Sequence, residues 1–378
     1  MRLAVVLDDF TPARGGAERY LAELAERLVA RGHEVRVYCR RHAEPPRGVT
    51  CVVVAAGGLT RVARERRFAA AACARAREEG CAPLLGIRHA PAVDLYQPHG
   101  GSWDASAAAR RACDPRPWRR AWRGFAQRWS PRHRHFRAVE RALLQRPDVV
   151  TLAVSERVRD DLAAIVPAAR ERTVVVPPAI DVERFAALAR ARADRPRAAR
   201  GATLLFVAHD FELKGLRHAL AAFARSDAAA RGARLEVAGR GDPAPYARLV
   251  AQLAIGAQVE FCGAPRDIAP LLAGADLLLH PTWFDPCALV CLEALAAGVP
   301  VVTTARNGAA SAVAEAGGRV VALPSEHAEL AAAIDALLAE GAAAEARAAA
   351  VGARFGWDES LRTLLPLLEA AAARRSAR

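Results

Sequence analysis

The chain alternates between short runs of apolar residues and longer stretches with apolar residues on one helical face. In the first half, the runs predict strands at residues 3–7, 34–39, 50–54, 83–87, 93–97, 149–154 and 173–176. The stretches predict helices at 17–31, 61–79 and 156–165. Strands that alternate with helices are typical of a parallel sheet covered by helices.

The alternation stops at Pro177 and Pro178. An Arg- and Ala-rich stretch follows as far as Gly201, and the alternation then starts again. Further strands are predicted at 203–207, 234–238, 259–262, 277–280, 301–303 and 320–322. We therefore expect an α/β protein with two doubly wound, Rossmann-like parallel-sheet domains that face a cleft, with ligands at the carboxyl ends of the strands. The expected parts are an N-terminal domain (1–177), a linker (178–200), a C-terminal domain (201–357) and a C-terminal helix (358–378) that packs back on the N-terminal domain.

Composition narrows the class of protein. Hydrophobic residues make up 53% of the 378 residues, charged residues make up 25%, and no apolar run is long enough to span a bilayer. The first apolar run ends in two acids, which favours a strand over a signal peptide, so we expect a soluble cytoplasmic protein. The eight cysteines include no Cys-x-x-Cys pair, which indicates reduced thiols and neither a disulfide framework nor a zinc site.

The net charge of +13 is concentrated in one segment. Residues 110–146 hold twelve Arg against Asp114 and Glu140, so the rest of the chain is nearly neutral. Within the segment, aromatic residues recur with helical spacing: Trp118, Trp122, Phe125 and Trp129. A helix with an aromatic stripe between guanidinium groups is typical of an element on an anionic membrane surface. Core packing is the alternative, and no nucleic-acid motif accompanies the segment.

Lysine is nearly absent from the chain. Of the 54 cationic residues, 53 are Arg and one is Lys214; Asn also occurs once, at Asn307. Lys is a compact point charge, and a position that keeps Lys in such a chain favours a phosphate site or a proton-transfer site. Lys214 follows the strand 203–207 and precedes a helix, so its ammonium should reach phosphate oxygens in the cleft. The alternative is a surface Lys retained by chance.

A second candidate site follows the strand that ends at His280. Pro286 suits the first turn of a helix, which would turn the N–H groups of Ala288, Leu289 and Val290 outward toward an anion. Asp285 and Glu293 flank this position, and carboxylates accept hydrogen bonds from hydroxyl groups. The pattern suits a phosphorylated, polyhydroxylated ligand such as a nucleotide sugar. The alternative is a helix N-cap at Asp285 and an incidental Glu293.

A glycine turn follows the first strand. Gly15 and Gly16 stand just before the first predicted helix, where they let a ligand approach the backbone and the N–H groups of the helix start. Such turns are common in proteins without ligands. The G-x-G-x-x-G pattern is absent there, so a dinucleotide-binding fingerprint is not supported.

Several segments together resemble a known family. They are the Gly-Gly turn, Ser-Glu-Arg-Val-Arg at 155–159, Val-Pro-Pro-Ala-Ile-Asp-Val-Glu-Arg-Phe at 176–185, Phe-Val-Ala-His-Asp-Phe-Glu-Leu-Lys-Gly at 206–215, and Asp-x7-Glu-Ala-Leu-Ala-Ala-Gly-Val-Pro at 285–300. Over nearly the whole chain, these segments are similar to family 4 of the retaining glycosyltransferases, which have the GT-B fold. Pro-Pro, Asp-Phe-x-x-Lys-Gly and Asp-Leu-Leu-Leu-His-Pro further resemble the bacterial lipopolysaccharide core glucosyltransferases that glucosylate inner-core heptose.

The resemblance implies roles for individual residues. Lys214 would bind the donor diphosphate, Asp285 the hydroxyls of the donor sugar, and Glu293 the ribose. The backbone of Ala288, Leu289 and Val290 would bind sugar and phosphate, and Gly15 and Gly16 would lie near the donor phosphate and the acceptor. His209 stands where the family usually has Arg and would assist Lys214. His99 matches a histidine near the reacting sugar in many relatives, and an ordinary loop histidine is the equal alternative.

The expected enzyme is a retaining hexosyltransferase that needs no metal and no cofactor. The family's mechanism implies front-face attack by an acceptor hydroxyl as the nucleotide diphosphate leaves. The resemblance also implies that residues 1–177 form the acceptor side and that residues 201–357 bind the nucleotide sugar. The expected partners are a nucleotide sugar, UDP-glucose in first place, a lipid-linked or lipopolysaccharide-core-like glycan, and the inner membrane face, with no nucleic acid. A nucleotide-sugar epimerase of similar fold and a basic RNA-binding protein are the alternatives, and release of UDP from UDP-glucose separates transfer from epimerisation.

Overall fold

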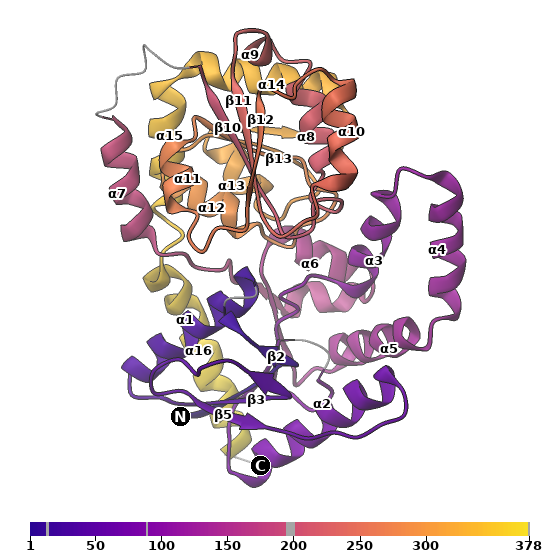
Figure 1. The fold of residues 1–378 in the computed structure, drawn as a ribbon. Coiled ribbons are helices and arrows are strands. Elements are labelled where there is room, and N and C mark those ends of the chain that lie inside the picture. Colours follow the sequence, from indigo (N-terminus) through magenta and orange to yellow (C-terminus); the bar gives the residue numbers. More distant parts are fainter. Residues whose placement is uncertain (13–14, 88–89, 194–200, 377–378) are drawn as a thin grey trace. The chain divides into compact units, whose positions relative to one another are not determined.

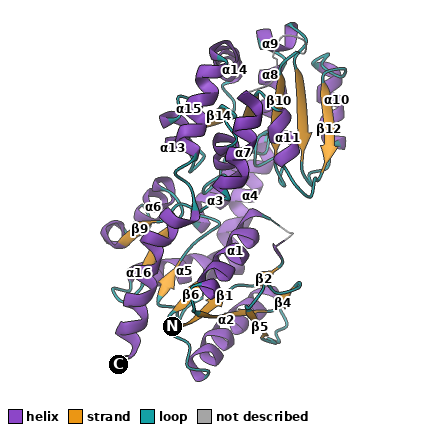
Figure 2. Cartoon of the chain, turned by 90° about the vertical axis from the view of Figure 1, so that its left-hand side faces the viewer, coloured by secondary structure: helices purple, strands orange, loops and turns teal. Residues whose placement is uncertain are grey.

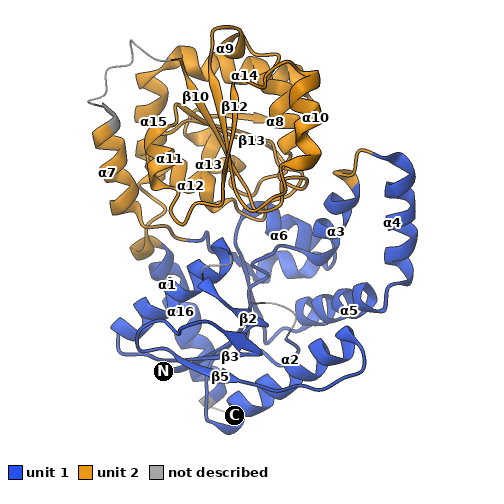
Figure 3. Ribbon diagram, in the orientation of Figure 1, with its two compact units in different colours: residues 1–111, 116–178, 360–378 blue, residues 112–115, 179–359 orange. Residues whose placement is uncertain are grey.

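The computed structural model describes residues 1–12, 15–87, 90–193 and 201–376. They form two compact units, each of which is built from more than one segment of the chain (Figure 3). Unit 1 comprises residues 1–111, 116–178 and 360–378, and unit 2 comprises residues 112–115 and 179–359.

Unit 1 contains a seven-stranded sheet in the order β5-β3-β1-β6-β7-β8-β9, in which every pair of neighbours is parallel. The strands of this unit are β1 (Arg2–Val6), β2 (Asp9–Phe10), β3 (Glu34–Cys39), β4 (Arg41–His42), β5 (Thr50–Val53), β6 (Leu84–Gly86), β7 (Leu95–Tyr96), β8 (Val150–Ala153) and β9 (Thr173–Val175). Its helices are α1 (Gly16–Ala30), α2 (Arg61–Glu78), α3 (Trp103–Ala112), α4 (Pro117–Trp129), α5 (Pro131–Gln145), α6 (Glu156–Ala163) and α16 (Trp357–Ser376), with a 3-10 turn at Pro167–Arg172 (Figure 1). The strand order reverses between β1 and β6.

Two details of this sheet differ from the sequence expectation. β7 covers Leu95–Tyr96, although a strand was expected over 93–97. The carboxylate of Asp94 accepts a hydrogen bond from the Leu84 N–H at 2.8 Å, so a side chain takes a place that a longer ladder would give to the backbone. β2 and β4 form a separate two-stranded parallel sheet that the pattern did not predict, because strands of two residues carry no periodicity.

Three consecutive helices, α3 to α5, stand between β7 and β8. Ser130 ends α4 and caps α5 by accepting a hydrogen bond from the His133 N–H, and Pro131 occupies the first turn of α5. The four aromatic side chains of α4 are 60–64% exposed: Trp118, Trp122, Phe125 and Trp129. This exposure excludes core packing as the reason for the aromatic stripe. Among the described residues, no helix is long and apolar enough to cross a bilayer.

The chain ends in the long helix α16, most of which belongs to unit 1. Ser360 Oγ donates to the Pro177 carbonyl oxygen at 3.4 Å, and Arg375 Nε lies 3.5 Å from Asp94 Oδ1. Residues 377–378 of the expected C-terminal helix lie outside the described residues.

Unit 2 contains a six-stranded parallel sheet in the order β12-β11-β10-β13-β14-β15. Its strands are β10 (Thr203–Val207), β11 (Arg234–Ala238), β12 (Val259–Gly263), β13 (Leu277–His280), β14 (Val301–Thr304) and β15 (Arg319–Val321). Its helices are α7 (Val182–Ala193), α8 (Leu216–Phe223), α9 (Asp227–Ala230), α10 (Ala244–Gln252), α11 (Ala269–Gly274), α12 (Leu289–Ala296), α13 (Ala310–Glu315), α14 (His327–Glu340) and α15 (Ala342–Gly352) (Figures 1 and 2). The two parallel sheets confirm the predicted fold class.

Both faces of the central strands β10 and β13 are largely buried. On β10, Leu204 and Phe206 pack in one apolar cluster with residues of α8 and α14, while Leu205 packs in a second cluster with residues of α11, α12 and α13. Successive side chains of a strand point to opposite faces, so a strand between two helical layers must be apolar throughout. This explains why β10 and β13 appear in the sequence as unbroken apolar runs.

The expected linker, residues 178–200, includes a helix. α7 packs against α11, α12 and α15, and the backbone N–H of Ile180 donates to the Phe355 carbonyl oxygen at 2.9 Å, so this segment is a packed part of unit 2. Residues 194–200 lie outside the described residues.

A close helix contact provides a test of this packing. A Cβ atom at Gly352, the last residue of α15, would lie 2.2 Å from the backbone nitrogen of Ala296 in α12. Gly352→Ala must therefore separate the two helices, and we expect it to lower the free energy of unfolding by about 1–3 kcal/mol in denaturant titrations. Gly274→Ala, where an added Cβ meets no atom within 4 Å, is the control. Equal stability of the two variants would contradict this account of the contact.

Candidate functional site

The strand order of unit 2 brings together two loops that are distant in the sequence. β10 and β13 are neighbours, and the order of strands reverses between them, which is the place where ligands commonly bind in doubly wound sheets. Lys214 follows β10 and Asp285 follows β13. Lys214 Nζ donates to Asp285 Oδ2 at 2.7 Å and to the Phe284 carbonyl oxygen at 2.9 Å. The two residues singled out by the sequence therefore form an ion pair.

The loop after β10 has a fixed conformation. Asp210 accepts a hydrogen bond from the Leu213 N–H at 3.0 Å through its side chain and from the Lys214 N–H at 2.9 Å through its carbonyl. Gly215 has a φ of +81°, and a Cβ there would lie 2.0 Å from the Pro281 carbonyl oxygen. Only glycine allows this close approach. The side chain of Lys214 is thereby directed to the loop after β13.

Burial decides the charge states at this site. Asp285 is 9% exposed; burial acts to raise the pKa of its carboxyl group, but Lys214 and His280 outweigh that effect and hold the pKa well below its usual range. His280 is 1% exposed, and its Nε2 lies 3.4 Å from Asp285 Oδ2. Burial lowers the pKa of His280, so its imidazole is neutral at pH 7. The site therefore contains one carboxylate and one ammonium beside a neutral histidine.

Asn307 holds the start of α12. Its Oδ1 accepts from the Ala288 N–H at 3.2 Å and from the Ala309 N–H at 3.0 Å, and its Nδ2 donates to Thr303 Oγ1 at 3.0 Å. The amide of Ala288, expected to face an anion, is thus occupied within the protein. α12 begins at Leu289, so Pro286 precedes the helix and does not form its first turn. The residue preceding α12 is Ala288, which excludes Asp285 as the N-cap.

The remaining candidates in unit 2 lie near this pair along the chain. Leu289 and Val290 form the first turn of α12 with partly exposed side chains, so their N–H groups stay candidates for an anion. Glu293 lies in the middle of α12 with its side chain 2% exposed. His209 is exposed, two residues beyond the end of β10.

Three further candidates belong to unit 1. Gly15 precedes α1, Gly16 is its first residue, and both are partly buried. His99 is half-buried in the loop after β7, and its ring centroid lies 5.1 Å from that of Tyr20. Burial raises the pKa of the Tyr20 hydroxyl, and the nearby side chains of Gln97 and Ser360 act to lower it. The loop that carries His99 therefore contacts α1.

Two residues that shape the site, His280 and Asn307, were not predicted from the sequence. The signal for Asn307 was present, because Asn and Lys each occur once in this chain and the argument made for Lys214 applies equally to Asn307. His280 carried no such signal, since a histidine at the end of an apolar strand does not reveal which loop will lie beside it.

The arrangement can bind an anion together with hydroxyl groups. The ammonium of Lys214 and the first amides of α12 are suited to phosphate oxygens, and Asp285 is suited to hydroxyl donors. A doubly wound sheet with such groups at its switch point is typical of enzymes that bind nucleotide derivatives.

Comparison with protein families agrees with this reading. Residues 14–184 match the model described as Glycosyltransferase Family 4, and residues 189–352 match the model described as Glycosyl transferases group 1. The chain belongs to family 4 of the glycosyltransferases. It is a retaining, metal-independent glycosyltransferase that uses a nucleotide sugar, with the GT-B fold predicted from its sequence.

Individual relatives point in the same direction. The chain is 28% identical over 326 residues to the lipopolysaccharide glucosyltransferase WaaG of Escherichia coli strain K12, with 84% of each chain covered. It is similar to the crystal structure of WaaG, a glycosyltransferase involved in lipopolysaccharide biosynthesis, with a TM-score of 0.75, 26% identity and 98% of each chain covered. Sucrose-phosphate synthase from Thermosynechococcus elongatus shares the fold, with a TM-score of 0.73, 22% identity and coverage of 99% of this chain and 100% of the other.

The ion pair makes stability depend on pH in a defined direction. Because the pKa of Asp285 is depressed in the folded state, its contribution is fully present above the unfolded pKa of about 3.9 and is lost as the pH falls toward the folded value. Asp285→Asn should lower the free energy of unfolding at pH 7. The difference in unfolding free energy between the variant and the wild type should be about 1 kcal/mol smaller at pH 3 than at pH 7. Denaturant titrations at both pH values measure this deficit.

The control for this test is Glu329→Gln, which alters an exposed carboxylate of the same unit. We expect a change below about 0.5 kcal/mol at either pH. A deficit for Asp285→Asn that is the same at pH 7 and pH 3 would show that the carboxylate is not held ionised by Lys214.

Proposed function

We propose that this protein transfers glucose from UDP-glucose to a hydroxyl group of a lipid-linked, lipopolysaccharide-core-like glycan acceptor. The observation that carries the proposal is the Lys214–Asp285 pair at the switch point of unit 2. The similarity to the lipopolysaccharide glucosyltransferase WaaG supports glucose as the sugar and a lipopolysaccharide core as the acceptor class.

In the proposed reaction, the bond between the anomeric carbon and the diphosphate oxygen breaks while the acceptor hydroxyl oxygen bonds to the same face of that carbon. The hydroxyl proton passes to the departing diphosphate. Negative charge grows on the leaving group, and the Lys214 ammonium lowers the barrier by donating to its oxygens. Asp285 accepts hydroxyl groups of glucose, Glu293 those of ribose, and Leu289 and Val290 offer backbone amides. His99 would lie near the reacting sugar, with Gly15 and Gly16 close to the donor phosphate, and His209 would assist Lys214.

An amphipathic surface supports a membrane-bound acceptor. The exposed aromatic side chains of α4 lie among arginines, and Arg119 Cζ is 5.2 Å from the Trp118 ring centroid. Such a surface is suited to the interface of an anionic bilayer, where indole rings lie at headgroup depth and guanidinium groups contact phosphate. We propose that α4 holds the protein on the inner face of the membrane.

Donor binding is tested by thermal shift with UDP-glucose, UDP and other nucleotide sugars. A ligand that binds only the folded state raises the unfolding temperature, and we expect the largest rise with UDP-glucose and UDP. Lys214→Ala should weaken UDP binding roughly 10- to 100-fold, since a charge-assisted hydrogen bond is lost. Release of UDP in the presence of a heptose acceptor then reports transfer, whereas intact UDP carrying a different sugar would indicate epimerisation.

The control is Arg217→Ala, which removes one exposed cation three residues further along the chain. Lys214→Ala leaves a buried carboxylate without its ammonium, so Lys214→Met combined with Asp285→Asn serves as a second variant that keeps the pair uncharged. Retained UDP binding in both Lys214 variants, with a normal unfolding transition, would overturn the proposed donor site.

Membrane attachment is tested by flotation with vesicles. Replacing Trp118, Trp122 and Trp129 with Ala should reduce flotation with anionic vesicles to the level seen with neutral vesicles, because the apolar contact area is removed. Val53→Ala with Leu59→Ala is the control, since both side chains are exposed apolar groups elsewhere in unit 1. Flotation that is unchanged in the triple variant would refute the role of α4.

A further inference from the structure

His280 is a buried titratable residue that the proposed reaction does not use. Its side chain is 1% exposed at the end of β13, and its ring centroid lies 6.4 Å from that of Phe206 on β10. Nε2 lies 3.4 Å from Asp285 Oδ2, which is longer than a usual N–H···O hydrogen bond, and Nδ1 has no partner among the described residues. Buried polar groups are nearly always hydrogen-bonded, so this imidazole is an exception.

The charged groups that act on His280 come from two loops. They are Asp285, which follows β13, and Lys214, which follows β10. The thiols of Cys287 and Cys291 lie near Asp285, and burial raises the pKa of both, so they are neutral. The neighbouring strands β10 and β14 contain no titratable residue. The imidazole therefore stands beside one carboxylate and one ammonium, whose charges balance.

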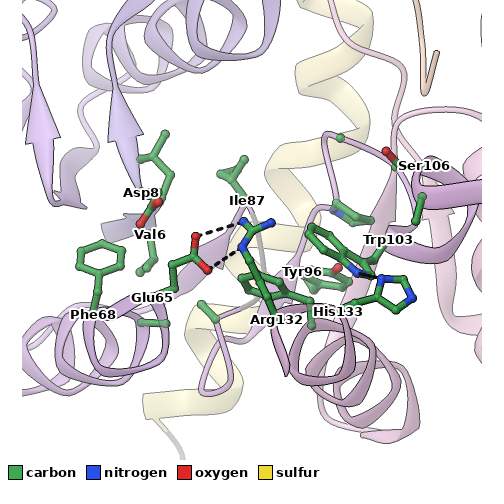
Figure 4. A pocket seen from close by; sticks show the side chains of 18 of the residues that line it. Val6, Asp8, Glu65, Phe68, Ile87, Tyr96, Trp103, Ser106, Arg132 and His133 are labelled. Atoms are coloured by element: carbon green, nitrogen blue, oxygen red, sulfur yellow. Dashed lines mark hydrogen bonds and ion pairs between the residues drawn. The ribbon is translucent and has the colours of Figure 1, made fainter. Parts of the chain in front are cut away.

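A carboxylate of unit 1 provides a contrast. Unit 1 has a cavity of about 510 Å³ at the carboxyl ends of β1, β6 and β7, with α2, α3 and α5 in the rest of its wall. Glu65 lines it and accepts from Arg132 at 2.9 and 3.0 Å (Figure 4) and from Arg61 at 3.1 Å. Two guanidinium groups, which do not lose their charge, hold this carboxylate. Asp285 has only the ammonium of Lys214 as a permanent cation in the described part of the chain.

Donor binding disturbs the balance at Asp285. An ammonium has three N–H donors, and Lys214 uses two of them for Asp285 Oδ2 and the Phe284 carbonyl oxygen, which leaves one for a phosphate oxygen. The Lys214 side chain is 19% exposed, so a ligand can reach it. A diphosphate brings negative charge only, and the buried Glu293 of α12 is acidic and offers no compensation. Added negative charge favours the protonated form of a nearby imidazole.

We propose that His280 takes up a proton from solvent when the diphosphate of a nucleotide sugar binds Lys214, and that the imidazolium then holds the Asp285 carboxylate in place for the sugar hydroxyls. The proposal rests on the proposed function, because that function brings a diphosphate to Lys214. In the donor complex, His280 Nε2–H donates to Asp285 Oδ2, and the ring is the second cation of the site. The proton returns to solvent when UDP leaves. His280 is thus a positioning residue that acts through Asp285.

Calorimetric titration with UDP-glucose, in buffers of different ionisation enthalpy, measures the proton uptake. UDP-glucose has no group that titrates between pH 6 and pH 8, so a proton taken up on binding goes to the protein. We expect the wild type to take up about half a proton at pH 7, and its affinity to rise about fivefold from pH 8 to pH 6.5. The rise has this sign because the complex binds more protons than the unliganded protein.

His280→Gln separates proton uptake from a purely structural role. Glutamine keeps an N–H donor but does not titrate, so we expect no proton uptake and an affinity that is independent of pH. A structural role would lower the affinity by the same factor at every pH. His327→Gln is the control, because it removes a partly buried imidazole of the same unit, and it should preserve the uptake.

Three results would overturn the proposal: wild-type binding of UDP-glucose without proton uptake, uptake that persists in His280→Gln, or uptake that disappears in His209→Gln with His280 intact. Should His280→Gln fail to fold, nitrogen NMR of the wild type reports the same event. The two ring nitrogens of His280 should become similar in chemical shift when UDP-glucose is added, and unchanged shifts would contradict the proposal. Absence of any UDP-glucose binding would count against the proposed function itself, whereas binding without uptake counts only against the role of His280.

Discussion

The buried pair between Lys214 and Asp285 is the interaction on which the organisation of unit 2 depends. Removing two charges from water is expensive, and the cost is offset only where the partners are held in good geometry. The strand order supplies that geometry, because adjacent strands β10 and β13 end at the same edge of the sheet. Gly215 allows the loops to touch, and Asn307 fixes the backbone beyond Asp285. The loops are therefore shaped around the pair before any substrate arrives.

Unit 1 has a similar strand topology, but a different set of charged side chains lies at its switch point. Its strand order also reverses beside the first strand, and an ion pair, Glu65 with Arg132, again joins two elements that are distant in sequence. In unit 2 the ammonium of Lys214 is paired with Asp285, and Asn307 accepts the Ala288 amide just before the start of α12. In unit 1 both carboxylates that line the cavity are paired with arginines: Asp8 with Arg40, and Glu65 with Arg132 and Arg61.

The bounds of strands were predicted correctly where the pattern of apolar residues is strong, and incorrectly where side chains take backbone hydrogen bonds. β3, β10, β11 and β13 have the expected bounds. β10 and β13 are nearly continuous apolar runs because both of their faces are buried, whereas β3 and β11 alternate apolar with charged residues. β7 and the start of α12 were misjudged, since the side chains of Asp94 and Asn307 take backbone hydrogen bonds there. The rarity of Lys identified Lys214 as a ligand candidate, but it could not reveal that Asp285 and the Phe284 carbonyl would be its partners.

By itself the sequence determined the class of fold, the order of the main strands and the family, because periodicity and local motifs act over short distances along the chain. The tertiary structure decided which groups meet. It placed His280 beside Asp285, gave the Ala288 amide to Asn307, and assembled the unit 1 cavity from three strand ends and several helices. These contacts join residues far apart in the chain, and their burial and charge balance arise only when the sheet brings them together.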